Sequence, residues 1–295
     1  MKIVITGADG QLGYDLKRVL GPVHKVIALN RKQLDVTDED AVKWTLMQHQ
    51  PDAVVHAAAY TNVDRAEAET EASYQVNALG ALHVASACHM LNAKLVHVST
   101  DYVFDGTKQC AYTEQDMPNP INIYGQSKLL GEKFVQLTCS QAFIVRTSWL
   151  YGAKGANFVT KVLEKARTTS ELTIVDDQFG SPTYCLDLAL MIRELLETEH
   201  YGLYHASNSG VCSRFEFARR ILQEAGLLQS VLLHPVPTEQ LPAVPAKRPM
   251  YSAFRHGAIE RHGLSPMRDW EAALAFFIRY DYDDSALRKQ ERGVR

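Results

Sequence analysis

Short apolar runs alternate with helical stretches through the first half of this chain, and that rhythm constrains the fold more than any other feature. The runs are nearly continuous in apolar residues, which is typical of strands buried on both faces of a sheet. Strands that alternate with helices form parallel sheets with crossover helices. We therefore predict a doubly wound, Rossmann-type α/β domain. Its predicted strands are residues 2–6, 25–29, 53–57, 94–98 and 142–147.

A glycine-rich turn follows the first predicted strand and opens a helix. Gly7, Gly10 and Gly13 are spaced by three residues, which is stricter than an unliganded turn requires. Glycines allow the close approach of a pyrophosphate, whose charge then meets the free N–H groups at the helix start. The turn predicts a dinucleotide site of the short-chain reductase type; the alternative is a strand-to-helix turn that binds nothing. The predicted contacts are Gly7, Asp9, Gly10, Gln11, Leu12 and Gly13.

The pattern becomes irregular after Trp149, which indicates a second, smaller α/β unit. We assign residues 1–150 to a cofactor-binding domain and 151–295 mainly to a substrate-binding unit, with about 180–200 returning to the first domain. Predicted helices lie near 158–167, 186–196 and 215–225, with a strand near 172–175. Prolines between 235 and 249 predict an ordered loop or strap. The charged stretch 281–295 predicts a frayed tail.

Composition excludes several classes of protein. The 295 residues carry a formal net charge of −3, so no electrostatic footprint for nucleic acid is present. The five cysteines are scattered without a C-x-x-C pair, which argues against disulfides and a thiolate zinc site. The glycine turn begins within a few residues of Met1, which leaves no room for a signal peptide. No segment is apolar enough to cross a membrane, so we expect a cytoplasmic protein.

The stretch after the second predicted strand bears on the choice of cofactor. No Asp or Glu stands at its end, where a carboxylate would bind the adenosine ribose, so NADPH is permitted and NADH is a second option. Asn30 and Arg31 follow the strand, and Arg31 is either a partner for the 2′-phosphate or a solvated loop cation. Asp35, with Val36 beside it, either contacts the adenine or caps the next helix.

The third predicted strand leads into Ala57, Ala58 and Ala59. These small residues suit a dinucleotide that passes close over the backbone; the alternative is tight packing without a ligand.

Tyr124 and Lys128 stand one helical turn apart on one face of a predicted helix. A tyrosine has an ordinary pKa near 10, and a nearby cation would lower it toward useful proton exchange. Lys128 supplies that cation and can also hold the nicotinamide ribose. Thr100 follows the fourth strand and can hydrogen-bond a substrate carbonyl, although such a residue alone is usually a helix cap or turn. Together these residues predict a nicotinamide-dependent reductase.

With these motifs assembled, the chain resembles the dTDP-4-dehydrorhamnose reductase family of the extended short-chain dehydrogenase/reductase superfamily. The resemblance spans nearly the whole chain and rests on more than the glycine turn and the Tyr/Lys pair. The other matching stretches are residues 56–64, 99–106, 146–152, 177–183 and 248–249.

The resemblance implies a catalytic triad of Thr100, Tyr124 and Lys128. Hydride would pass from NADPH to the C4 ketone of dTDP-4-dehydro-L-rhamnose, giving dTDP-L-rhamnose, a precursor of cell-surface polysaccharide. Tyr124 would donate the proton, Thr100 would polarise the carbonyl, and Asn77 would support a water-mediated proton relay. Arg248 would meet the diphosphate. The implied substrate contacts are Val63, Thr100, Asp101, Tyr102, Tyr124, Trp149 and Arg248.

Some members of the family hold a divalent ion at a dimer contact, with a carboxylate shortly after the glycine turn. Asp15 occupies that place here. We identify no full set of metal ligands, so we assign no metal site and leave Mg²⁺ dependence and a homodimer open.

Two alternatives to the reductase remain. An epimerase or dehydratase with the same fold would return the hydride to the sugar and consume no NADPH. A non-catalytic NADP-binding regulatory subunit, like the beta subunit of methionine adenosyltransferase, would keep the motifs without turnover.

Overall fold

A computed structural model describes residues 1–282 of the chain, and most of the predicted tail lies outside them. The centre is a six-stranded parallel sheet with the order β10-β5-β4-β3-β1-β2. The strand bounds are β1 Lys2–Thr6, β2 Lys25–Leu29, β3 Ala53–His56, β4 Lys94–Thr100, β5 Ala142–Thr147 and β10 Gly202–His205. The chain begins inside the sheet and winds outward in both directions, which confirms the predicted doubly wound sheet.

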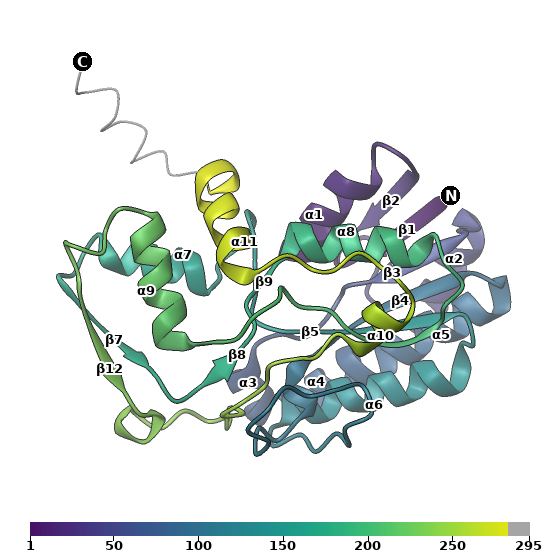
Figure 1. The fold of residues 1–295 in the computed structure, drawn as a ribbon. Coiled ribbons are helices and arrows are strands. Elements are labelled where there is room, and N and C mark those ends of the chain that lie inside the picture. The colour runs from purple at the N-terminus through teal and green to yellow at the C-terminus, as the bar shows by residue number, and fades with distance from the viewer. Residues whose placement is uncertain (283–295) are drawn as a thin grey trace.

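Helices cover both faces of this sheet. Figure 1 shows α1 (Gln11–Leu20) and α8 (Cys185–Leu196) on one side, with α5 (Gly80–Leu91) and α6 (Ile123–Thr138) on the other. Helix α2 (Glu39–His49) joins the second group. Alternate strand residues feed the two layers, because successive side chains point to opposite faces. Ile3 and Ile5 pack toward α1 and α8, and Val4 packs toward α2 and α5.

A third run of helical turns links β3 to α5. Helices α3 (Val63–Ala68) and α4 (Thr70–Tyr74) lead into a π-helical turn η1 (Gln75–Leu79). Asn62 starts α3 by accepting a hydrogen bond from the Arg65 backbone N–H. A short 3₁₀ turn η2 (Asp101–Val103) follows β4 directly.

The second unit lies beyond the carboxyl ends of the main strands and has its own apolar core around Tyr151, Phe217 and Phe277 (Figure 1). Its helices are α7 Phe158–Ala166, α9 Arg214–Glu224 and α11 Trp270–Phe276, with turns η3 Thr238–Gln240 and η4 Phe277–Asp281. Helix α10 Gly257–Arg261 packs instead against β10 of the main sheet. Its strands form three pairs: β7 Glu171–Val175 with β12 Leu232–Val236, β6 Leu150–Tyr151 with β9 Thr183–Tyr184, and β8 Phe179–Gly180 with β11 Cys212–Ser213.

One sequence expectation is wrong. Pro235 was expected to begin a loop or strap, but it lies inside strand β12, paired in parallel with Ile174 of β7. This sheet has only two strands, so the missing N–H of proline can face away from the partner strand.

After the first strands of the second unit, the chain returns to the main sheet through α8 and β10. Helix α8 packs beside α1, and β10 pairs with β5 at the sheet edge.

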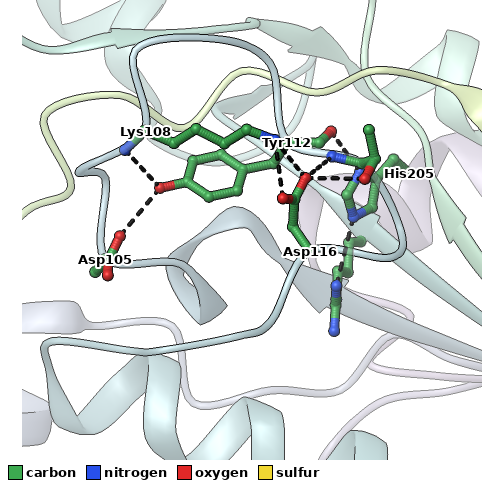
Figure 2. Close-up of polar contacts among 7 residues, drawn as sticks. Asp105, Lys108, Tyr112, Asp116 and His205 are labelled. Carbon is green, nitrogen blue, oxygen red and sulfur yellow. Dashed lines mark hydrogen bonds and ion pairs between the residues drawn. The ribbon is translucent and has the colours of Figure 1, made fainter.

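The long connection from η2 to α6 is held by its own polar side chains (Figure 2). The Tyr112 hydroxyl donates to Asp105 at 3.0 Å, and the Lys108 ammonium pairs with Asp116 at 2.7 Å. His205 of β10 contacts the Tyr112 carbonyl at 3.1 Å through Nδ1. These contacts tie the connection to the sheet edge and so place the start of α6.

The five cysteines are all free. Within residues 1–282, no helix combines the length and apolar character that a membrane span requires.

Candidate active site

A cavity of about 780 Å³ lies at the carboxyl ends of strands β1, β3, β4 and β5. Ligands bind at this edge in open α/β sheets. Of the residues to which the sequence analysis gives a role at the cofactor or substrate, Arg248 and Asn77 do not line the cavity and the others do. Motifs that are far apart in sequence, from the glycine turn to Trp149, therefore share one space.

The glycine turn forms one end of the cavity. Gly7 has a φ of 68°, and a Cβ there would come within 2.7 Å of the Ala58 backbone nitrogen. A Cβ on Gly13 would lie 2.5 Å from the Gly7 carbonyl oxygen. No side chain caps the start of α1 at Gly10. The free N–H groups of α1 therefore face the cavity, which fits the pyrophosphate of a dinucleotide.

The adenosine end carries Arg31 and Asp35, whose side chains lie 3.6 Å apart. The Asp35 carboxylate accepts hydrogen bonds from the backbone and hydroxyl of Thr37, which lower its pKa. Asp38, not Asp35, caps α2 by accepting from the Ala41 N–H at 2.9 Å. Arg31 is 83% exposed, so its guanidinium is accessible to a phosphate.

The opposite end holds the residues of the proposed triad. Asn122 caps α6 by accepting a hydrogen bond from the Gly125 N–H, and this places Tyr124 in the first turn. Thr100 ends β4, and its side chain lies close enough to Tyr124 to act on the pKa of that phenol. Its hydroxyl oxygen also accepts from the Tyr102 N–H at 3.2 Å. Thr100 therefore caps η2 while facing the cavity.

The pKa of Tyr124 is not lowered by Lys128, as the sequence led us to expect. Burial raises the pKa of Tyr124, with smaller contributions from Asp101 and Tyr102. The Lys128 ammonium donates to the Val98 carbonyl at 2.6 Å, and burial lowers its pKa to about 8. Thr100, rather than Lys128, is the partner that lowers the pKa of Tyr124, and burial outweighs it. At neutral pH Tyr124 is protonated and suited to proton donation.

The family can be assigned at this point. The chain matches the model described as the RmlD substrate binding domain over residues 1–282. The chain belongs to the dTDP-4-dehydrorhamnose reductase family. Its similarity to curated and solved relatives covers nearly their whole length, so the match includes both units of the fold.

Three relatives illustrate this similarity. The chain is 43% identical to the spore coat polysaccharide biosynthesis protein SpsK of Bacillus subtilis, covering 94% of this chain and 97% of the relative. It is 38% identical to a dTDP-4-keto-6-deoxy-D-glucose reductase of Streptomyces niveus, covering 92% and 94%. The crystal structure of dTDP-4-dehydrorhamnose reductase from Bacillus anthracis in complex with NADP is 45% identical, with a TM-score of 0.91 and coverage of 94% and 99%.

A buried ion pair lies behind the three residues of the predicted triad. Glu132 of α6 accepts two hydrogen bonds from Arg146 of β5, at 2.9 and 2.7 Å, and one from the Ser99 hydroxyl at 2.5 Å. The side chains of Arg146 and Glu132 are only 3% and 2% exposed. This network joins α6 to the strands that end beside Tyr124 and Thr100.

Asp101, Tyr102 and Trp149 line the end of the cavity that is predicted to bind the substrate. Asp101 accepts hydrogen bonds from Ser252 at 2.6 Å and Thr100 at 3.0 Å, and burial raises its pKa to about 6. The Tyr102 ring stands edge-on to Tyr124, with centroids 5.7 Å apart. Trp149 has a φ of 47°, an uncommon conformation that turns the chain here into the second unit.

Two predicted residues serve other contacts. Arg248 does not line the cavity, because its guanidinium binds both Asp64 carboxylate oxygens at 2.7 Å. Asn77 is buried, where its amide exchanges hydrogen bonds with the Tyr60 backbone and donates to Ser127. Neither observation tests a role in catalysis.

Sequence reasoning missed the second unit's share of the cavity. Ala156, Asn157 and Arg214 line it from that unit. Asn157 and Ser213 each begin a helix with a capping box. These boxes are readable as helix starts, but nothing local shows that the helices begin beside the dinucleotide cavity.

Proposed function

We propose that this protein reduces the C4 ketone of dTDP-4-dehydro-L-rhamnose to dTDP-L-rhamnose with NADPH, in the synthesis of a cell-surface polysaccharide precursor. The observation that carries the proposal is that Thr100, Tyr124 and Lys128 line the same cavity as the glycine turn. The solved relative in complex with NADP supports the choice of cofactor. NADH is the second candidate donor, because Arg31 is exposed rather than preset for a phosphate.

NADPH supplies the hydride when it is bound, and residues of this chain would hold and orient it. The helix start at Gly10 to Gly13 would hold the pyrophosphate. Ala57 to Ala59 would lie under it, and Asn30, Arg31, Asp35 and Val36 would surround the adenosine end. Lys128 would bind the nicotinamide ribose hydroxyls from the floor of the cavity.

Tyr124 would donate the proton that the reduced ketone oxygen takes up. Its phenol is protonated at neutral pH, and the alkoxide that forms from the ketone is basic enough to take this proton. The Thr100 hydroxyl, which lines the same cavity as Tyr124, would polarise the same oxygen. Val63, Asp101, Tyr102 and Trp149 would shape the sugar pocket and keep water from the reacting atoms.

The substrate test follows NADPH absorbance with the purified protein and a ketone made from dTDP-glucose in place. The 4,6-dehydratase and the 3,5-epimerase together supply dTDP-4-dehydro-L-rhamnose. We expect NADPH loss equal to the dTDP-L-rhamnose formed. A keto-sugar converted to an isomer without net NADPH loss would indicate an epimerase instead. Bound NADPH without turnover would indicate the regulatory-subunit alternative.

A second substrate is favoured by one specific observation. The Streptomyces niveus relative is named a dTDP-4-keto-6-deoxy-D-glucose reductase, and that ketone is the precursor before epimerisation. Omitting the epimerase from the same assay offers only this ketone. We expect much slower NADPH oxidation without the epimerase. An equal or faster rate would show that the unepimerised ketone is the preferred substrate.

Location in the cytoplasm stays a prediction from the sequence, and the resemblance leaves Mg²⁺ dependence and a homodimer open. The chemistry proposed above needs none of them.

A further inference from the structure

Arg214 is a cation that the proposed mechanism does not use. It lines the same cavity as the triad. The two other cations of the lining have partners, since Arg31 lies beside Asp35 and Lys128 donates to the Val98 carbonyl. Within residues 1–282 the Arg214 guanidinium forms no hydrogen bond or ion pair, and the titratable groups that act electrostatically on it are Tyr102, Asp101, Cys212 and Arg248. A half-buried cation without an acid partner points to an anionic ligand.

The local structure holds this guanidinium in one orientation. Arg214 is the first residue of α9, directly after the capping box formed by Ser213 and Glu216. Its guanidinium carbon lies 3.5 Å from the ring centroid of Trp149 and 5.1 Å from that of Phe158. Stacking on an aromatic face leaves the N–H edge of the guanidinium free for hydrogen bonds.

The position of Arg214 separates it from the cofactor pyrophosphate. Asp101 and Tyr102, which line the end predicted to bind the sugar, are among its electrostatic neighbours, and Asp9, the charged residue of the glycine turn, is not. Arg248 is the other guanidinium near the sugar end, but Asp64 occupies both of its outer nitrogens at 2.7 Å. Of these two arginines, only Arg214 faces the cavity with an open hydrogen-bonding edge.

We propose that Arg214 binds the diphosphate of the sugar nucleotide, because its stacked, unpaired guanidinium faces the sugar end of the cavity. The identity of this ligand rests on the proposed function. The phosphates carry the formal negative charge of a dTDP-sugar, and a guanidinium matches two phosphate oxygens with parallel hydrogen bonds. The stack on Trp149 orders the arginine before the ligand arrives, so less entropy is lost on binding.

The test measures nucleotide binding by calorimetry on the NADP⁺-loaded protein, with dTDP and thymidine as separate probes. Arg214→Met should weaken dTDP binding about ten- to hundredfold, the range expected for one lost charge-assisted contact. Thymidine binding should change less than about twofold, since thymidine has no phosphate. Arg214→Lys keeps the positive charge but loses the paired N–H donors of the guanidinium, so its dTDP affinity should lie between those of wild type and Arg214→Met. NADP⁺ affinity and the melting temperature report whether each variant is folded.

Arg219→Met is the matched control, because Arg219 is exposed on the same helix. It removes an equal charge and should leave dTDP affinity unchanged. Equal dTDP affinity in wild type and Arg214→Met, or an equal loss for thymidine, would overturn the inference. A wild-type protein that binds no dTDP would overturn it too. Arg214-dependent dTDP binding without turnover of either ketone would contradict the proposed function alone.

Discussion

Tyr124, Lys128 and Glu132 lie four residues apart on helix α6, and each has a different role. Tyr124 faces the cavity, Lys128 lies beneath it, and Glu132 is buried against β4 and β5. The tyrosine and lysine could be read from their spacing alone, because a spacing of four places side chains on one helical face. The pKa directions could not, since they depend on how deeply the fold buries Tyr124 and Lys128.

The pKa of Lys128 predicts how turnover depends on pH. Burial lowers that pKa to about 8, so the ammonium is charged below about pH 8 and becomes neutral above it. Since the cation orients the cofactor ribose, we expect kcat/KM to fall as pH rises through about 8 to 9. The measurement is NADPH oxidation across pH, with circular dichroism at each point as the folding control. A rate that stays level up to pH 10 would count against this role.

Glu132→Gln tests the buried support of the triad. The change leaves Arg146 buried without its full charge partner, so we expect a loss of about 3 to 5 kcal/mol in the free energy of unfolding. Urea denaturation measures it. Glu260→Gln is the control, since Glu260 pairs with Arg255 on the surface and should cost less than about 1 kcal/mol. Similar losses for the two variants would show that the buried pair has no special weight.

Secondary structure was predicted best where one apolar run coincides with one element. Strands β1, β2 and β5 have the expected bounds. Strand β4 continues two residues further, to Thr100, through pairing with β5. Pro235 misled the prediction, because local sequence cannot show that a strand has a neighbour on one side only. Likewise, Arg214 lies far along the chain from Trp149, and only the packing of α9 brings the two together.

The glycine turn makes a prediction at the scale of an element. A Cβ on Gly13 would lie 2.5 Å from the Gly7 carbonyl and 2.7 Å from the Ala8 Cα. Gly13→Ala should therefore shift the turn away from the start of α1 and weaken NADPH binding by more than about tenfold, or about 1.4 kcal/mol. Fluorescence titration with NADPH measures the affinity.

Gly226→Ala separates binding from general destabilisation. Gly226 has a φ of 69° and open space around its Cβ position, so alanine strains the backbone by about 1 kcal/mol without touching the cavity. Its NADPH affinity should equal that of wild type. If Gly13→Ala also bound NADPH normally, the turn would not be the pyrophosphate site.

At the scale of the whole molecule, the cavity exists because two units meet along one edge of the sheet. The main sheet supplies the glycine turn and the triad, while Asn157 and Arg214 come from the second unit. The family assignment and the fold were both predictable, because their signals lie in contiguous motifs. The substrate end was less predictable, since it depends on how distant segments pack.

The most direct test of the central claim is turnover of the dTDP-keto-sugar by Tyr124→Phe. The change removes one buried hydroxyl, and Tyr74→Phe, which removes a hydroxyl bonded to Gln126 outside the cavity lining, is the matched control. If Tyr124 is the proton donor, its variant should bind NADPH like wild type but lose about 10²- to 10⁴-fold in kcat, while the control keeps full activity. Wild-type turnover by Tyr124→Phe would contradict the proposed mechanism.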